Sequence, residues 1–185
     1  MFISENLFTS APASAGRLSR ETRVYALLDE KGIEYSGLDH DEADTMEKCL
    51  ELESKLGAKI CKNLFLCNRQ ETEFYLLMMP GDKPFKTKYL SAQINSSRLS
   101  FASAENMEKY LDILPGAVSF FGLMNNKEKN VRLLVDKDLL SCEYLGCHPC
   151  VCTSVLKIRT ADLFDVLAPS FGVTPETVEL PDVIE

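Results

Sequence analysis

The stretch KNLFLCNRQETEFYLLMM, residues 62–79, decides the fold of this chain. It holds two apolar runs, 62–68 and 73–79, separated by a short polar connection over 69–72. Two such runs joined by a tight polar turn predict an antiparallel hairpin. Both runs are apolar at successive positions, so we expect both faces of each strand to be buried and the hairpin to lie centrally in its sheet.

Helices and strands are predicted to interleave on both sides of this hairpin. The first predicted helix runs from a Ser19 cap to Gly32, and the second from an Asp44/Glu47 capping box to Gly57. The buried face of the second is expected to hold Met46, Cys49, Leu50 and Leu56. Further helices are predicted over 88–94, from a Ser103 cap, and from a Thr160 cap to a stop at Pro169. The further predicted strands are 33–38, 130–136 and 153–158. The hairpin excludes a purely parallel, doubly wound sheet. We therefore predict an α/β fold, a single compact domain with a mixed, largely antiparallel, barrel-like sheet wrapped by helices.

Length and composition suit one globular domain. The chain has 185 residues, of which 45% are hydrophobic. We expect the domain to occupy 19–173, between an N-terminal extension, 1–18, and an acidic C-terminal tail, 174–185. No apolar run approaches the roughly 20 residues that span a membrane, and residues 1–16 carry no basic residue of a targeting signal. The sequence therefore predicts a cytoplasmic monomer without membrane contact.

The net charge of −8 is unevenly distributed along the chain. Residues 34–53 hold eight acids and one lysine, and the tail 174–185 holds four acids and no base. The rest of the chain therefore has an excess of positive charge, which leaves room for an anionic partner.

The sequence contains neither a GxGxxG nor a GxxxxGK[ST] pattern, so a nucleotide-cradling loop is not indicated.

A second unusual stretch is GCHPCVCT, residues 146–153, which combines three cysteines with one of the two histidines. Structural zinc sites tend to use two separated ligand pairs, and no second pair is recognisable in this sequence. A thioredoxin-type cysteine pair would sit at the start of a helix, whereas this turn leads into a predicted strand. Neither metal nor redox chemistry is favoured, and no cofactor is predicted. The odd number of cysteines, seven, predicts free thiols in a reducing compartment.

Five short segments follow one another in order along the chain: KNLFL (62–66), LSFAS (99–103), PGAVSFFGL (115–123), VRLLVD (131–136) and HPCVCTSVLKI (148–158). Together they resemble the prolyl-tRNA editing family, the freestanding aminoacyl-tRNA deacylases related to the editing domain inserted in bacterial prolyl-tRNA synthetase. The resemblance implies a compact α/β fold and hydrolysis of tRNA(Pro) mischarged with a smaller amino acid, alanine above all. It makes the acceptor end of tRNA(Pro) the partner, and prolyl-tRNA synthetase a candidate second partner.

The resemblance also implies roles for individual residues. It gives catalytic roles to Lys62 at the pocket mouth near the phosphate of the terminal adenosine, to Gly116 at the start of the loop that lines the aminoacyl pocket, and to His148 in the His-Pro turn. The implied substrate-binding residues are Asn63, Ala117, Val118, Ser119, Phe120, Asp136, Pro149, Cys152 and Thr153. Two of these depart from the family pattern, because Phe120 replaces a proline of the loop and Cys152 replaces an asparagine.

The residue types suit ester hydrolysis without the family name. The reaction needs an attacking water, donors for the developing oxyanion and a hold on the tRNA end. Lys62 offers a charge to a phosphate, or is a solvent-facing lysine at a strand edge. The loop 116–119 offers backbone N–H groups, or is a simple turn. His148 positions the water or the substrate amino group, or is structural. Asp136 ends a strand near the same site, or serves as a turn or cap residue.

Three further alternatives stay open. Phe120 either points into the pocket and narrows it against proline, or packs in the core beside Phe121. A thiol of Cys150 or Cys152 beside His148 is an alternative nucleophile. The two departures from the family pattern also suit a binding module that holds an aminoacylated tRNA end, or another small ligand, without hydrolysing it.

Overall fold

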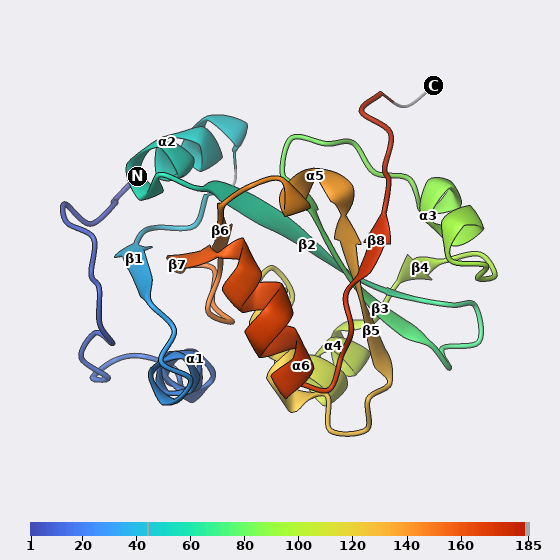
Figure 1. Cartoon of the computed structure of the whole chain (residues 1–185), viewed down its shortest axis with the longest axis horizontal. Helices are drawn as coiled ribbons and strands as arrows, with labels where there is room; N and C mark the ends of the chain where they lie inside the picture. The colour runs from blue at the N-terminus through green and yellow to red at the C-terminus, as the bar shows by residue number, and fades with distance from the viewer. Residues whose placement is uncertain (44, 184–185) are drawn as a thin grey trace.

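A central mixed sheet organises the chain in the computed structural model, which describes residues 1–43 and 45–183 (Figure 1). The strands run in the order β1-β7-β6-β2-β3-β5-β8, and β4 pairs with β2. They are β1 Tyr35–Asp39, β2 Lys59–Cys67, β3 Phe74–Pro80, β4 Ser100–Phe101, β5 Val131–Asp136, β6 Tyr144–Cys147, β7 Ser154–Arg159 and β8 Glu176–Val178. Among the described residues, four strand pairs are antiparallel and three are parallel. The predicted mixed α/β sheet is therefore confirmed.

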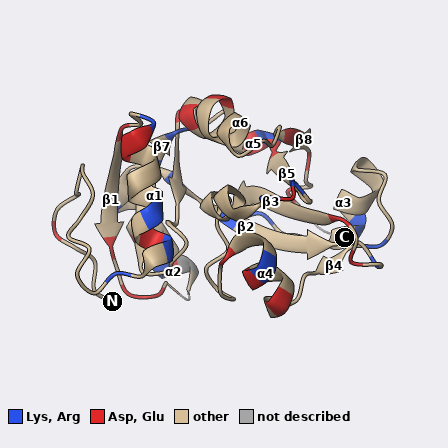
Figure 2. Cartoon of the chain, turned by 90° about the horizontal axis from the view of Figure 1, so that it is seen from below, with Lys and Arg blue, Asp and Glu red and all other residues tan. Residues whose placement is uncertain are grey.

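Helices cover both faces of this sheet. They are α1 Ser19–Glu30, α2 Met46–Leu56, α3 Thr87–Gln93, α4 Ala104–Leu111, the 3-10 helix η1 Phe120–Asn125, α5 Lys137–Leu140, the π-helix η2 Asp162–Leu167 and α6 Ala168–Ser170. Helices α1, α4, η1 and η2 pack on one face, and α2 and α3 pack on the other. Charged residues gather on helices and loops (Figure 2), whereas every residue of β3 is buried.

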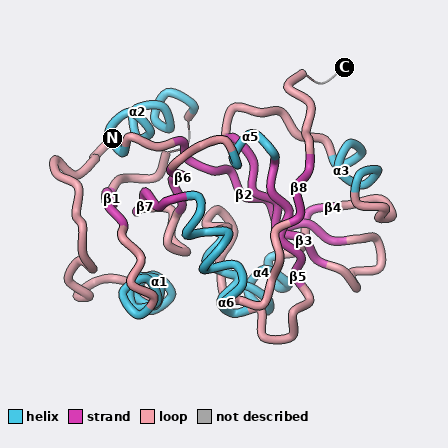
Figure 3. Tube along the Cα trace, in the orientation of Figure 1, coloured by secondary structure: helices cyan, strands magenta, loops and turns pink. Residues whose placement is uncertain are grey.

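The predicted hairpin is formed by β2 and β3 and lies in the middle of the strands (Figure 3). The two strands pair antiparallel with Leu64 opposite Leu77. Asn68 closes the turn, because its side-chain oxygen accepts hydrogen bonds from the N–H groups of Thr72 and Glu73, at 2.9 and 3.2 Å. The amide thereby satisfies two backbone donors that the turn would otherwise leave without a partner.

Strand β2 belongs to two groups of strands at once. Its first residues, Lys59 and Ile60, pair with β6, and its last two pair with β4. Residues 61–67 pair with β3 along the other edge. On the edge away from β3, residues 61–65 therefore lie between the β6 ladder and the β4 ladder within the described part of the chain. Figure 1 shows β2 as the long strand that crosses between the two groups.

One face of β2 is lined by side chains two residues apart, which are Ile60, Lys62, Leu64 and Leu66. Helix α2 covers Ile60 through Leu56, and α3 covers the two leucines through Leu90. Lys62 stands between the two helices with an exposed side chain. Because only the apolar positions of this face are covered by helices, the layer formed by α2 and α3 has an opening at the lysine.

Helix α2 confirms one predicted end and corrects its predicted buried face. Gly57 ends the helix in the left-handed region at φ 69°, which favours glycine. Thr45 caps its start with its side chain. The predicted Asp44 cap and the predicted burial of the Met46 side chain lie outside what the structure describes. The expectation that Leu50 is buried is wrong, since it is 56% exposed while Leu52 is buried. Two residues along a helix correspond to about 200°, so these two leucines face opposite sides.

Three further predicted helix ends are wrong. Leu18 stands at the cap of α1, and Ser19 is the first helical residue. Thr160 does not cap the last helix, because its hydroxyl donates to the carbonyl of Cys142 instead. Pro169 lies within that helix and does not stop it. The wider π turns of η2 precede the proline, which relieves the clash between its ring and the preceding turn.

Both segments that flank the predicted domain contact the sheet. Within residues 1–18, Phe8 forms a backbone bridge to Gly37, and a Cβ on that glycine would lie only 2.4 Å from the Phe8 ring. Within residues 174–185, β8 pairs with β5 and Leu180 is buried. Among the described residues, no helix is long and apolar enough to cross a membrane.

Phe120 occupies the centre of an aromatic cluster in the main core. Its side chain is fully buried. The ring lies 5.6 Å from Phe121, 6.2 Å from Phe164 and 5.6 Å from Phe171 between centroids. These contacts match the second alternative given for Phe120, in which its ring packs in the core beside Phe121.

We expect Phe120→Ala to lower the free energy of unfolding by about 3–5 kcal/mol, because it empties a fully buried aromatic site. Urea denaturation followed by circular dichroism measures this loss. Phe101→Ala is the matched control, since Phe101 is 63% exposed and should cost less than about 1 kcal/mol. Equal midpoints for the parent and Phe120→Ala would contradict the packing role.

Candidate functional site

A cavity of about 430 Å³ opens between α2, the start of β2 and the loop that follows β3. Two of the three residues predicted to be catalytic, Lys62 and His148, line it. The other lining residues are Ala43, Thr45, Cys49, Leu50, Glu53, Lys59, Ile60, Cys61, Gly81 and Asp82. The opening at Lys62 described above is therefore the mouth of a real pocket, and α2 forms the wall that faces it.

His148 is held in one tautomer. Its Nδ1 lies 2.7 Å from the carbonyl oxygen of Ser154. A carbonyl only accepts hydrogen bonds, so Nδ1 carries the proton and Nε2 carries the free lone pair. Withdrawal from water lowers the pKa of His148 from 6.5 to about 4; the Ser154 bond raises it and the neighbouring His40 lowers it further. The imidazole is therefore neutral at pH 7 and acts as a hydrogen-bond acceptor.

His40 is the site residue that the sequence did not reveal. It is buried, and its ring lies 5.6 Å from the His148 ring between centroids. Its Nδ1 donates to the carbonyl of Asp41 at 2.7 Å, and its Nε2 is buried without a hydrogen-bond partner among the described residues. Pairing of β1 with β7 brings it there, since its backbone N–H donates to Thr153. The one available signal was that the chain has only two histidines.

The glycine loop is tied to the His-Pro turn but does not line the cavity. Gly116 adopts φ 89°, in the region that favours glycine. Ser119 is buried, and its hydroxyl donates to the backbone carbonyl of His148. Ala117 and Val118 pack against the main core. The N–H of Ala117 already donates to Leu114, at 3.1 Å.

The two thiols of the turn are poor nucleophiles. Cys150 is buried at φ 62°, and burial raises its pKa to about 12. Burial and a hydrogen bond to Glu42, 3.2 Å from sulfur to Oε1, raise the pKa of Cys152. A thiol attacks as the thiolate, so both groups are inactive near pH 7. Pro149 beside them is buried, and Thr153 is exposed.

The other predicted substrate-binding residues, including Pro149, Cys152 and Thr153 of the turn, do not line the cavity either. Asn63 follows Lys62 on β2 and therefore points to the opposite face. Phe120 lies in the core. Asp136 is fully buried and binds the ammonium of Lys83 with both carboxylate oxygens, at 3.1 Å each. Its side chain also accepts from the N–H groups of Leu180 and of Asp138, and the Asp138 bond caps the start of α5, which matches the alternative role of Asp136 as a turn or cap residue.

The described residues hold no group of three or more His, Cys, Asp or Glu side chains placed to bind a metal ion. All seven cysteines are free thiols. Cys61 and Cys147 lie one step beyond the β2–β6 ladder, and their thiols contact each other, which together with burial raises the pKa of Cys61. The sulfur-rich turn thus contributes packing around the pocket floor.

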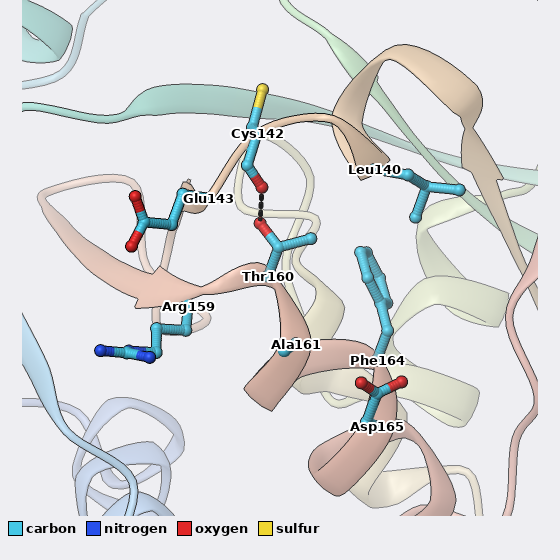
Figure 4. A pocket seen from close by; sticks show the side chains of 8 residues that line it. All are labelled: Leu140, Cys142, Glu143, Arg159, Thr160, Ala161, Phe164 and Asp165. Atoms are coloured by element: carbon cyan, nitrogen blue, oxygen red, sulfur yellow. Dashed lines mark hydrogen bonds between the residues drawn. The ribbon is translucent and has the colours of Figure 1, made fainter.

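A second cavity, of about 390 Å³, lies between the segment before β6 and η2 (Figure 4). Its lining residues are Leu140, Cys142, Glu143, Arg159, Thr160, Ala161, Phe164 and Asp165. Figure 4 shows the hydrogen bond from Thr160 to the Cys142 carbonyl on its wall. It contains none of the predicted site residues, so the cavity lined by Lys62 and His148 is the candidate site.

Comparison with known proteins identifies the family of this chain. Residues 40–166 match the aminoacyl-tRNA editing domain. The chain is 32% identical over 157 residues to the prolyl-tRNA editing protein ProX of Acetoanaerobium sticklandii, which covers 85% of this chain and 95% of that protein. It is 27% identical over 142 residues to the prolyl-tRNA synthetase associated domain-containing protein 1 of Danio rerio, or 76% of this chain and 77% of that protein.

A crystal structure of a candidate trans-editing enzyme for prolyl tRNA synthetase has the same fold. It superposes with a TM-score of 0.67 over 90% of this chain and 99% of that chain, at 14% identity. The family match and the ProX similarity each extend over most of the sequence, including β2 and the His-Pro turn. The chain therefore belongs to the family of aminoacyl-tRNA editing domains.

Proposed function

We propose that this protein is a trans-editing deacylase that hydrolyses the aminoacyl ester of mischarged tRNA(Pro), with alanine as the amino acid removed. The observation that carries the proposal is the cavity lined by both Lys62 and a neutral His148. Membership of the editing-domain family and the similarity to ProX support the same substrate class. The proposed enzyme is a cytoplasmic monomer that needs no cofactor.

Hydrolysis requires water to attack the carbonyl carbon of the ester. The carbonyl oxygen then bears the negative charge of a tetrahedral intermediate. Collapse of this intermediate breaks the bond to the ribose oxygen, which takes up a proton, and the amino acid leaves as its carboxylate. The protein has to orient the water, stabilise the oxyanion and hold the adenosine.

His148 suits the first of these tasks as an acceptor. Its fixed tautomer presents the Nε2 lone pair to a water or to the substrate α-ammonium group. With a pKa of about 4 the ring is too weak a base to keep the proton of the water. The proposed role of His148 is therefore to orient, and the ribose hydroxyl beside the ester assists the proton transfer.

Lys62 and the glycine loop suit the other two tasks. The ammonium of Lys62 stands exposed at the mouth, where it can bind the phosphate of the terminal adenosine as a point charge. In the glycine loop, Ala117 already uses its N–H in the turn. The amides of Gly116 and Val118 make no hydrogen bond to other described residues, so these two are the proposed oxyanion donors. The loop lies outside the cavity but is tied to the His-Pro turn through Ser119, so this role requires the ester carbonyl to lie on the loop side of His148.

The direct test follows ester loss from labelled Ala-, Cys-, Ser- and Pro-tRNA(Pro). We expect Ala-tRNA(Pro) to be deacylated fastest and Pro-tRNA(Pro) to be spared, because a pocket that discriminates by size gives about 1–3 kcal/mol per methylene. Binding of all four substrates without any ester loss would instead identify a binding module.

In this assay Lys62→Ala should lower kcat/KM for Ala-tRNA(Pro) by about 10- to 100-fold, the usual effect of losing a hydrogen bond to a charged group. Its unfolding free energy should stay within about 0.5 kcal/mol of the parent's, because the side chain is exposed. Lys109→Ala, on the opposite face of the sheet, is the control and should keep full activity. Full activity of Lys62→Ala would show that Lys62 is a solvent-facing lysine at a strand edge with no role in deacylation.

His148 predicts a specific pH dependence. The neutral imidazole persists down to about pH 4, so the deacylation rate, corrected for spontaneous hydrolysis, should show no inflection near pH 6.5. The unfolded chain binds the proton more tightly than the folded one, so the stability gained from neutral His148 is complete above pH 6.5 and is lost as the pH falls towards 4.

Rates and urea midpoints measured from pH 4.5 to 7.5 test both statements. His148→Gln should have a flatter stability profile over this interval than the parent, and a lower rate throughout. A rate inflection near pH 6.5 that disappears in His148→Gln would show that His148 titrates normally and acts as a base.

A further inference from the structure

The segment between β3 and β4 is a basic part of this acidic chain. Residues 81–101 hold four basic residues and one acidic residue. Lys83 is buried in an ion pair, and the side chains of the other three basic residues are exposed. We use the name α3–β4 surface for these three and the neighbouring exposed aromatic ring, which are Lys86, Lys88, Arg98 and Phe101.

This surface lies beside the candidate cavity on the same side of the sheet. Gly81 and Asp82 line the cavity, and the loop that contains them leads directly into α3. Lys62 shares one face of β2 with Leu66, and Leu66 pairs with Phe101. Four residues of a strand span about 13 Å at about 3.3 Å each. The surface therefore begins a few nucleotide lengths from the lysine at the cavity mouth.

The opposite rim of the cavity carries charge of the other sign. Residues 41–56, which include α2, hold six acids and two lysines. Glu47 and Glu51 are exposed, and Glu53 lines the cavity. Figure 1 shows α2 and α3 at opposite ends of β2. A polyanion that reaches the cavity is repelled on the α2 side and attracted on the α3 side.

Phe101 adds a second kind of contact to this surface. Its side chain is 63% exposed although the residue is fixed in β4. The ring meets Phe85 edge to face, with centroids 6.4 Å apart. Because Phe85 packs against the core that contains Leu90 of α3, the exposed ring has a rigid support. Unpaired nucleobases stack on exposed rings of this kind, next to cations that bind their phosphates.

We infer that the α3–β4 surface binds the unpaired 3′ end of the tRNA acceptor, with its phosphates on Lys86, Lys88 and Arg98 and one base stacked on Phe101. The inference rests on the proposed function, because it takes the terminal adenosine to sit at Lys62. Two regions would then bind the substrate. The cavity binds the aminoacyl adenosine, and the α3–β4 surface binds the nucleotides before it.

Fluorescence anisotropy with uncharged tRNA(Pro), measured over a range of salt, tests the phosphate contacts. The triple variant Lys86→Gln/Lys88→Gln/Arg98→Gln should raise Kd at least tenfold and lower the slope of log Kd against log salt by about 2, at about 0.7 per phosphate contact. The matched control is Lys109→Gln/Lys127→Gln/Lys129→Gln, which changes the charge equally elsewhere. Equal weakening by both triples would overturn the inference.

Phe101→Ala tests the stacking contact. We expect it to raise Kd about tenfold and Phe101→Tyr to restore binding, since either aromatic ring can stack on a base. The melting temperature of each variant should match the parent's, because all the altered side chains are exposed. Unchanged binding by Phe101→Ala would remove the aromatic contact from the assignment and overturn it.

Uncharged tRNA carries no ester, so this test is independent of hydrolysis. If the variants lose binding as expected while no aminoacyl-tRNA loses its ester, the proposed activity fails and the surface stands. If Ala-tRNA(Pro) is deacylated but neither the triple variant nor Phe101→Ala weakens binding, the surface is overturned and the activity stands.

Discussion

The structure depends on strand β2, whose backbone pairs with three neighbouring strands. Its start pairs with β6, its end with β4 and its length with β3. Two groups of strands with different directions meet on this one strand, so its middle lies between ladders. Helices α2 and α3 bury the apolar positions on either side, at Ile60 and Leu64. A lysine at the position between them, Lys62, stays exposed beside a cavity without any loss of core packing.

The opposite wall of the cavity depends on buried polar contacts rather than on apolar packing. The carbonyl of Ser154 fixes the His148 ring, and the hydroxyl of Ser119 holds its backbone carbonyl. Pairing of β1 with β7 places the His40 ring next to the His148 ring. Each of these groups would be costly to bury alone, and together they leave one imidazole nitrogen free at the cavity. Burial keeps His148 neutral and the Cys150 thiol protonated, so the proposed hydrolysis relies on an oriented water rather than on a thiolate nucleophile.

Charge complements this geometry on a larger scale. The chain is acidic overall at −8, but its acids are concentrated before and within α2 and near the C-terminus. The exposed basic residues around α3 lie on the other side of the Lys62 opening. A cavity with rims of unlike charge gives an approaching polyanion one preferred direction. The net charge of a protein is therefore a poor guide to its partners when the charges are separated in space.

The sequence by itself determined the features that depend on near neighbours in the chain. The apolar runs of 62–79 specified the central hairpin, Gly57 the end of α2, and five ordered segments the family. Tertiary structure alone decided that Phe120 packs in the core, that Asp136 binds Lys83, and that His40 meets His148. The direction of a side chain and its burial depend on residues far away in the chain, such as His40 and His148, which strand pairing brings together. No local pattern of residue types encodes such contacts.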